Sequence, residues 1–225
     1  MHYIARNPKN AKVYQKLVQS CKYFFIKNPI LVYEGISFDI CWYDINENWL
    51  MMNQTSCKLW ITHYLQITPR NHEDIPHASS LIPKIYQFDL FDLNLSILTI
   101  SYNVFMSLCS SVKTLSLNRA TVKNDDGTVV SFEKIIEQLP NSFELGGIRE
   151  DFDIDIFYSF MKKNKNTRVH LKFSDQISEE YKARLEAIVD EIIATKNREY
   201  KPPLIDFRGL HREKSNKLFL FFCFT

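Results

Sequence analysis

Apolar residues recur at helical spacing in the first part of the chain. Four of them fall at positions i, i+4, i+8 and i+11: Val13, Leu17, Cys21 and Phe24. This spacing predicts one buried face of an amphipathic helix over residues 8–26. Asn7 can cap the helix, and Pro8 suits its first turn because the amide that proline lacks would have no partner there. Asn28 and Pro29 are expected to end it.

The next segment alternates apolar and polar residues, as a half-buried strand does. The alternating apolar positions are Ile36, Phe38, Ile40 and Trp42. Together with turn-forming side chains at 46–48 and a returning run at 49–52, they predict a β-hairpin over residues 36–52. Residues 30–33 form a short β-rich run before the hairpin, and residues 68–80 are predicted to be a polar loop.

Further along, short runs of β-favouring residues recur at similar intervals. One central apolar residue marks each run: Leu59, Ile85, Leu115, Phe143, Val169 and Leu204. The intervals between these residues are 26, 30, 28, 26 and 35. Helices are predicted between several of the strands, over residues 99–109, over 131–139, from Asp153 or Asp155 onward, and over 179–195.

The helix over residues 179–195 has the clearest pattern. Ser178 can cap it, and Glu179 and Glu180 stand at the positive end of the helix dipole. Its apolar face consists of six residues: Tyr181, Leu185, Ile188, Val189, Ile192 and Ile193. We therefore expect this helix to be a core element of the fold.

Strand–helix units of about 26–30 residues are typical of leucine-rich-repeat-like arrays, in which one unit cannot bury its apolar face alone and neighbours stack. The expected fold class is α/β, a leucine-rich-repeat-like stack of strand–helix units with an N-terminal helix and hairpin. An unrelated α/β domain with similar strand spacing is the alternative. We expect residues 1–54 to form the helix and hairpin region, 55–210 the repeat-like domain, and 211–225 a C-terminal tail.

Stacked parallel strands present alternate side chains to the core and to an outer face. With the central apolar residues inward, the residues after them point outward: Trp60, Tyr86, Ser116, Glu144, His170 and Ile205. Repeat arrays commonly bind partners across such a face, and interface energy concentrates in Trp, Tyr and Arg. Trp60 and Tyr86 are thus the expected anchors for a partner. The alternative is that both pack under the N-terminal helix and hairpin.

Charge and cysteine content narrow the classes of function. The chain has 28 basic and 26 acidic residues and an isoelectric point of about 8.2, whereas nucleic-acid-binding domains commonly exceed about 9. Five widely spaced cysteines favour an intracellular protein with reduced thiols over a disulfide scaffold. The uncharged run 93–112 is too polar to span a membrane, and the apolar run 218–224 is too short. We expect neither nucleic acid nor a membrane as a partner.

An acidic string is the first candidate for metal chemistry. Asp151, Asp153 and Asp155 could open a calcium loop, but the sixth and twelfth positions hold Ile156 and Lys162 where the loop needs Gly and Glu. A negative patch at a helix N-terminus is the expected role.

Other catalytic patterns are weaker still. A zinc set could be drawn from Cys57, His63, His72 and His77, but their spacings match no compact ligand motif. No G-x-S-x-G, Walker A, G-x-G-x-x-G or H-E-x-x-H sequence occurs. Cys21 and Cys109 lie on apolar helix faces, where cysteine usually serves as a small core residue. We expect no metal, no cofactor and no enzymatic activity.

Several longer stretches of the sequence together carry a resemblance to a known protein family. They are residues 13–29, 80–86, 121–127 and the run from Phe152 through Pro203. Together they resemble a large, nematode-expanded family of F-box-associated proteins of the FTH type, over most of the chain from about residue 10 to 210. The likeness contains no catalytic signature.

The resemblance implies an intracellular, cytoplasmic or nuclear protein-interaction module. In such proteins an F-box docks a Skp1-like adaptor and the C-terminal domain recruits a protein target for ubiquitylation. This chain departs from the pattern because no F-box-like segment is evident before residue 30, the linker 140–152 is short, and residues 218–225 are unusually aromatic. A Skp1-like adaptor is therefore expected only with an F-box upstream. A divergent paralogue without activity, or an unrecognised enzyme, are the alternatives.

Overall fold

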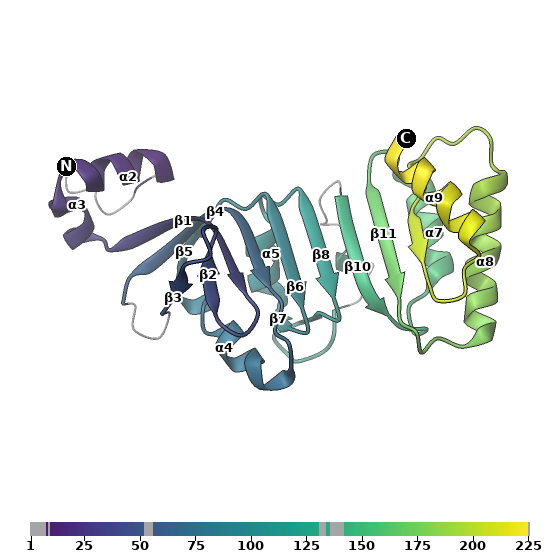
Figure 1. Ribbon diagram of the computed structural model, residues 1–225, viewed down its shortest axis with the longest axis horizontal. Coiled ribbons are helices and arrows are strands. Elements are labelled where there is room, and N and C mark those ends of the chain that lie inside the picture. The colour runs from purple at the N-terminus through teal and green to yellow at the C-terminus, as the bar shows by residue number, and fades with distance from the viewer. Residues whose placement is uncertain (1–7, 9, 52–55, 131–133, 136–141, 225) are drawn as a thin grey trace. The chain divides into compact units, whose positions relative to one another are not determined.

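The described chain divides into two units, and each contains parallel strands and helices (Figure 1). The computed structural model describes residues 8, 10–51, 56–130, 134–135 and 142–224. Unit 1 holds the described residues up to Leu98 together with Val104–Val112, and unit 2 holds Thr99–Asn103 and the described residues from Lys113 onward. The class is mixed α/β with mostly parallel strands, as the sequence predicts.

The predicted N-terminal helix is present as two shorter helices. They are α2 (Ala11–Ser20) and α3 (Lys22–Lys27), separated by Cys21 in an extended conformation. Asn10 caps α2, because its side-chain oxygen accepts a hydrogen bond from the Val13 amide at 3.1 Å. The predicted cap, Asn7, lies outside the described residues.

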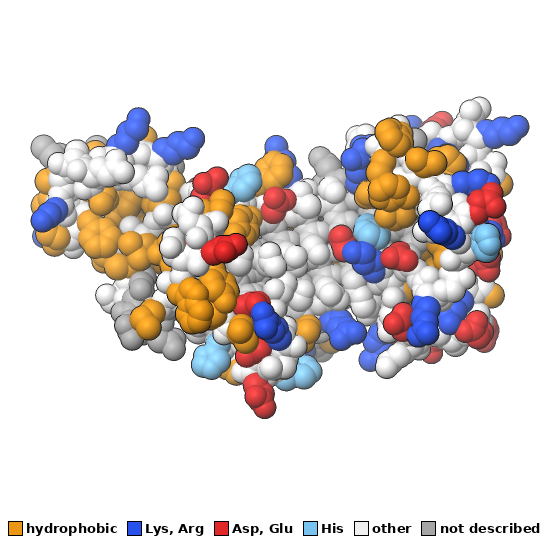
Figure 2. All heavy atoms as spheres, viewed as in Figure 1, with side chains coloured by type: hydrophobic (Ala, Val, Ile, Leu, Met, Phe, Trp, Pro, Cys, Tyr) orange, Lys and Arg blue, Asp and Glu red, His pale blue; other side chains and the backbone are white. Residues whose placement is uncertain are grey.

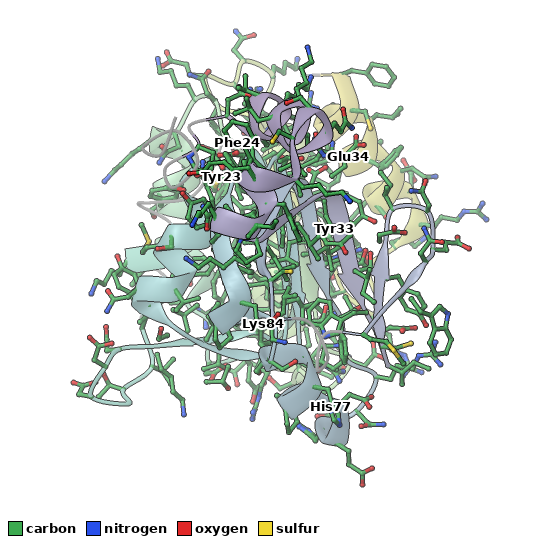
Figure 3. The ribbon with its side chains drawn as sticks, turned by 90° about the vertical axis from the view of Figure 1, so that its left-hand side faces the viewer. Tyr23, Phe24, Tyr33, Glu34, His77 and Lys84 are labelled. Atoms are coloured by element: carbon green, nitrogen blue, oxygen red, sulfur yellow. The ribbon has the colours of Figure 1, made fainter. Side chains whose placement is uncertain are left out.

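The buried face of α2 differs from the predicted one. Ala11 and Tyr14 are buried, whereas Val13 is 54% exposed and Cys21 is exposed. The Tyr14 hydroxyl donates to the Asn28 carbonyl at 2.5 Å and accepts from the Ile30 amide at 3.3 Å. These two bonds satisfy backbone groups where the chain enters the sheet, so the tyrosine face packs inward although the Val13 face has the better apolar spacing. The ring of Phe24, which is also buried, meets that of Tyr23 edge to face on α3 (Figure 3).

Strand β4 (Lys58–Ile67) lies at the centre of the unit 1 sheet. On one side it pairs in parallel with β1 (Ile30–Phe38), which continues antiparallel into β2 (Trp42–Asp44) and β3 (Trp49–Leu50). On the other side it pairs in parallel with β5 (Ile85–Phe88) and then with β6 (Asp92–Ser96), a strand that the sequence did not indicate. The predicted hairpin is thus the antiparallel edge of this sheet.

Two local features shape this edge. Gly35 lies at a bulge where the register between β1 and β4 shifts, and a Cβ at this position would overlap the ring of Tyr64. The turn between β2 and β3 holds Glu47 at a positive φ of 61°. Asp44 stabilises that turn by accepting hydrogen bonds from the Asn46 and Asn48 amides, each at 2.9 Å. The predicted polar loop after β4 contains the short helical turns η2 (His72–Asp74) and α4 (Ile75–Ser79), and η3 (Ile82–Lys84) precedes β5.

The parallel strands of the unit 2 sheet follow one another in chain order. They are β8 (Thr114–Asn118), β10 (Ser142–Ile148), β11 (Arg168–Phe173) and β12 (Leu204–Asp206). Two further strands, β7 (Thr99–Ser101) and β9 (Thr121–Lys123), form a separate parallel pair that the sequence did not indicate.

Three of the five predicted strand equivalences are confirmed by the observed register. Leu115 pairs with Phe143, and Phe143 with Val169; within unit 1, Leu59 pairs with Ile85. The last equivalence is wrong by one residue, because Leu204 pairs with His170 and Ile205 with Leu171.

Helices cover one face of the unit 2 sheet. They include α7 (Ile154–Lys163), capped by Asp153 as predicted, and α8 (Glu179–Ala194), capped by Ser178. The ring of Tyr181 on α8 meets that of Phe173 on β11 at 5.8 Å, so α8 packs on the face that carries the apolar side chains of β11.

The structure agrees with some of the remaining helix predictions and differs from others. The prediction over 99–109 is met by α5 (Tyr102–Cys109), preceded by β7. The prediction over 131–139 falls mostly outside the described residues, of which 134–135 are helical. Helix α9 (Arg212–Phe224) forms where a tail was expected. Among the described residues, no helix combines the length and the apolar character needed to cross a membrane.

Candidate functional site

The outer face of β8, β10 and β11 is the surface that sequence reasoning singled out within unit 2. Along these strands buried and partly exposed residues alternate, as expected for a sheet covered by helices on one face. The inward residues Leu115, Phe143 and Val169 are at most 2% exposed. Glu144 pairs in register with Ser116 on one side and His170 on the other, so the structure brings these three predicted residues together on the outer face.

Charged groups meet at the middle of this face. The Glu144 carboxylate lies 2.7 Å from the Lys172 ammonium and 3.5 Å from Nδ1 of His170. Charged side chains gather over β10 and β11 in the space-filling view (Figure 2). Asp206 stands opposite Lys172 on β12. This arrangement makes a polar, mixed-charge surface, and no nucleophile and base are in contact among the residues described on it.

Burial lowers the pKa of His170 below its ordinary value, although the neighbouring Glu144 and Asp206 carboxylates oppose that shift. Its side chain is only 18% exposed, and the ring of Phe222 on α9 lies 6.2 Å away. The imidazole is therefore held neutral in the folded protein at pH 7.

We expect the stability of unit 2 to fall as the pH drops below about 6.5, where an unperturbed histidine takes up its proton. The unfolded chain then binds more protons than the folded chain at this position, so protonation favours unfolding. Urea unfolding of the wild type and of His170→Gln at pH 7.5 and 5.5 measures this effect, and His63→Gln, at an exposed position, is the control. An equally steep pH dependence in His170→Gln would show that other groups cause it.

The two predicted anchors of unit 1 lie against the N-terminal helix. Trp60 is fully buried in a cluster with Ala11, Tyr14 and Ile30, and Tyr86 packs against this cluster. This is the alternative environment that the sequence left open. The partner-anchor role is therefore wrong for Trp60, because a side chain with no exposed surface cannot contact a partner.

The contacts of these two aromatic residues explain their position. The indole N–H of Trp60 donates to a carboxylate oxygen of Asp89 at 2.6 Å, and its ring centre lies 5.9 Å from that of Tyr86. The Lys58 ammonium stands 5.4 Å from the centre of the Tyr86 ring. Ile205, predicted to point outward, is also buried, at 1% exposed, and its neighbour Leu204 occupies the outward position instead.

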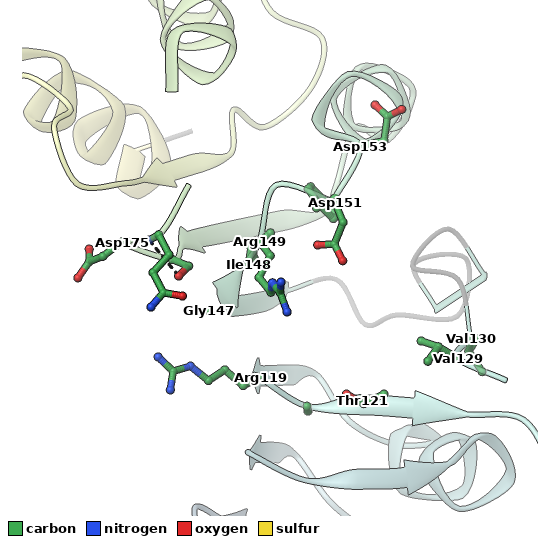
Figure 4. A pocket seen from close by; sticks show the side chains of 14 residues that line it. Arg119, Thr121, Val129, Val130, Gly147, Ile148, Arg149, Asp151, Asp153 and Asp175 are labelled. Carbon is green, nitrogen blue, oxygen red and sulfur yellow. Dashed lines mark hydrogen bonds between the residues drawn. The ribbon is translucent and has the colours of Figure 1, made fainter. Parts of the chain in front are cut away.

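A hollow of about 1010 Å³ opens in unit 2 beside the segments that follow β8, β10 and β11 (Figure 4). Sequence reasoning missed it. The exposed side chains of Arg119 and Arg149 line it and form no ion pair with any described residue. Asp151, Asp153 and Asp175 line it as well. Because both signs of charge are present, the hollow favours neither an anion nor a cation.

The backbone at this hollow has two left-handed residues. Arg119 has a φ of 53° and Gly147 a φ of 65°. A Cβ on Gly147 would lie 2.6 Å from Cγ of Arg119, so glycine lets the arginine stem pass close to β10. The adjacent Gly146 accepts a hydrogen bond from the Arg119 amide at 3.1 Å. The Gly146–Gly147 pair, in a chain with 5 glycines, was the one sequence signal that could have indicated this close approach.

The structure describes the acidic residues and the thiols that were considered for chemistry. Asp153 caps α7 by accepting from the Asp155 and Ile156 amides, each at 3.1 Å, which confirms the predicted helix N-terminal patch. All five cysteines are free thiols, and burial raises the pKa of Cys109 to about 12. Within the described residues, no three His, Cys, Asp or Glu side chains gather as a metal site would require.

Comparison with protein-family models, with curated proteins and with solved structures finds no match to this chain.

Proposed function

We propose that this protein is a protein-interaction module of the F-box-associated type, built as a leucine-rich-repeat-like stack, that binds an unidentified protein target. The observation that carries the proposal is the outer face of β8, β10 and β11, where Ser116, Glu144 and His170 stand side by side in register. Parallel strands that follow one another in chain order, with helices such as α7 and α8 on the opposite face, resemble the arrangement that repeat proteins use to present such a surface.

The chemistry of the face agrees with binding better than with catalysis. Its side chains are polar and partly exposed, and its charges are already paired at 2.7 Å between Glu144 and Lys172. Polar surfaces with paired charges bind partners by complementarity across many contacts, whereas active sites are usually concave pockets with unpaired catalytic groups. In this proposal the protein acts inside the cell, and a Skp1-like adaptor is a partner only where an F-box precedes the chain.

Introducing a long cationic side chain into the middle of the face tests the proposal. We expect Ser116→Arg to lower recovery of the target about tenfold in affinity purification with mass spectrometry, because the new side chain holds the partner away from the sheet. His170→Ala should lower recovery less. Ala187→Arg, which places the same side chain at an exposed position on α8, is the matched control.

The melting temperature of each variant is measured alongside recovery. Proteins that co-purify with the wild type and with Ala187→Arg, but not with Ser116→Arg, are the candidates for the target. If Ser116→Arg keeps its melting temperature and recovers the same proteins as the wild type, the outer face is not the binding surface.

A further inference from the structure

The second half of α9 exposes apolar side chains that the fold does not use. Leu218 is fully buried, but Phe219, Leu220 and Phe224 are 54%, 53% and 81% exposed. In the space-filling view the apolar side chains over α9 form one cluster with Lys and Arg side chains around it (Figure 2). Exposed apolar clusters surrounded by polar residues commonly mark interaction sites.

A strongly basic edge of unit 2 lies beside this cluster. The segments 162–168 and 191–201, which lead into β11 and β12, contain seven basic residues and two acidic ones. Both acidic residues are already paired, Glu191 with Lys162 at 2.7 Å and Glu199 with Lys165 at 2.8 Å. Among the described residues, Lys163, Lys196 and Lys201 form no ion pair, so their charge is uncompensated. We call α9 from Phe219 to Phe224 together with this basic edge the α9 patch.

Direct contacts join the two parts of the α9 patch. The guanidinium of Arg198 lies 4.1 Å from the centre of the Phe221 ring, and that of Arg168 lies 5.8 Å from the centre of the Phe222 ring. These contacts hold two cations of the basic edge beside the aromatic rings of α9.

We propose that the α9 patch binds an acidic protein segment that also carries apolar side chains. Its carboxylates pair with the uncompensated cations, and its apolar side chains cover Phe219, Leu220 and Phe224. The charge argues against a second copy of this chain, since a symmetric contact would bring two basic edges together. The proposal rests on the proposed function and names a class of partner for it.

Fluorescence anisotropy with the full chain tests the inference. The probe is a labelled dodecapeptide in which glutamate alternates with leucine and serine, and the control peptide has lysine in place of glutamate. We expect the glutamate peptide to bind, with an affinity that falls as salt rises. Leu220→Ser should weaken binding about tenfold, as should Lys196→Gln.

Matched controls are Ile156→Ser, at a helical position that is 53% exposed on α7, and Lys16→Gln, at an exposed position on α2. Neither control should change binding, and melting temperatures show whether each variant is folded. Equal losses in the patch and control variants would overturn the proposal, as would no binding of the glutamate peptide or preferred binding of the lysine peptide.

Two further probes separate other classes of partner. One probe is a vesicle that contains phosphatidylserine, and the other is a single-stranded oligothymidine. If either binds and loses binding in Leu220→Ser and Lys196→Gln, the assignment to an acidic protein segment is overturned. Ser116→Arg should leave peptide binding unchanged. If the peptide does not bind while Ser116→Arg still abolishes target recovery, the class of partner is wrong and the proposed function stands.

Discussion

Replacing Trp60 by alanine is expected to destabilise unit 1 by about 3–5 kcal/mol, the usual cost of removing a buried aromatic side chain. The side chain is fully buried near the start of β4, against Tyr14 of α2 and Ile30 of β1. Its removal leaves a cavity beneath α2 and deprives Asp89 of the indole donor at 2.6 Å. A loss of this size is a large share of the stability of an ordinary domain.

Urea unfolding followed by circular dichroism measures this loss. Trp49→Ala is the matched control, because Trp49 belongs to the same unit but is 74% exposed, and it should change the free energy of unfolding by no more than about 0.5 kcal/mol. Trp60→Phe keeps most of the apolar volume and removes the N–H donor, so it should cost about 1 kcal/mol. Equal effects of Trp60→Ala and Trp49→Ala would mean that Trp60 is exposed, and its role as a partner anchor would return.

The sequence predicted unit 2 well where only one face of a strand is buried. Along β8, β10 and β11 the apolar residues alternate with polar ones, and this alternation determines which residues share a face. The equivalence of Leu115, Phe143 and Val169, and the neighbourhood of Ser116, Glu144 and His170, followed from that pattern.

The same logic failed where both faces are covered. Leu59, Trp60 and Ile61 are consecutive and fully buried, and on β12 Leu204 and Ile205 are both buried although they face opposite ways. An apolar run of this kind carries no information about which residue points outward. The cover on the second face comes from elements distant in the sequence: α2 over Trp60, and α9 against β12.

Other features depend on contacts that no local pattern contains. Tyr14 and not Val13 is the buried residue of α2 because its hydroxyl bonds backbone groups of Asn28 and Ile30, which lie 14 and 16 residues further along the chain. The hollow of unit 2 gathers Arg119 and Arg149 from the segments that follow two separate strands, β8 and β10. The basic character of the α9 patch appears only when the segments before β11 and β12 lie side by side, as the ion pair of Lys165 with Glu199 shows.

Replacing Ile188 by alanine is expected to destabilise unit 2 by about 2–5 kcal/mol. Ile188 is 6% exposed on α8, and it lies between Leu185 and Ile192, both fully buried on the same helix face. Alanine has the higher helix propensity, so the loss reports packing and not helix formation. The expected change is a clear fall in the melting temperature and in the free energy of unfolding.

Ile156→Ala on α7 is the matched control, because it makes the same substitution at a helical position where little packing is lost. Ile156 is 53% exposed at a helical position, so the same substitution should be neutral or slightly stabilising there. Unfolding of both variants in urea, followed at the far-ultraviolet helix signal, gives the comparison. If Ile188→Ala has the same melting temperature as the wild type, α8 does not bury this helix face. The apolar layer described between α8 and the strands of the proposed binding surface would then be wrong. If only Ile188→Ala is destabilised, the apolar layer between α8 and the strands supports the outer face from behind. A binding variant on the outer face that keeps the wild-type melting temperature then leaves this layer intact.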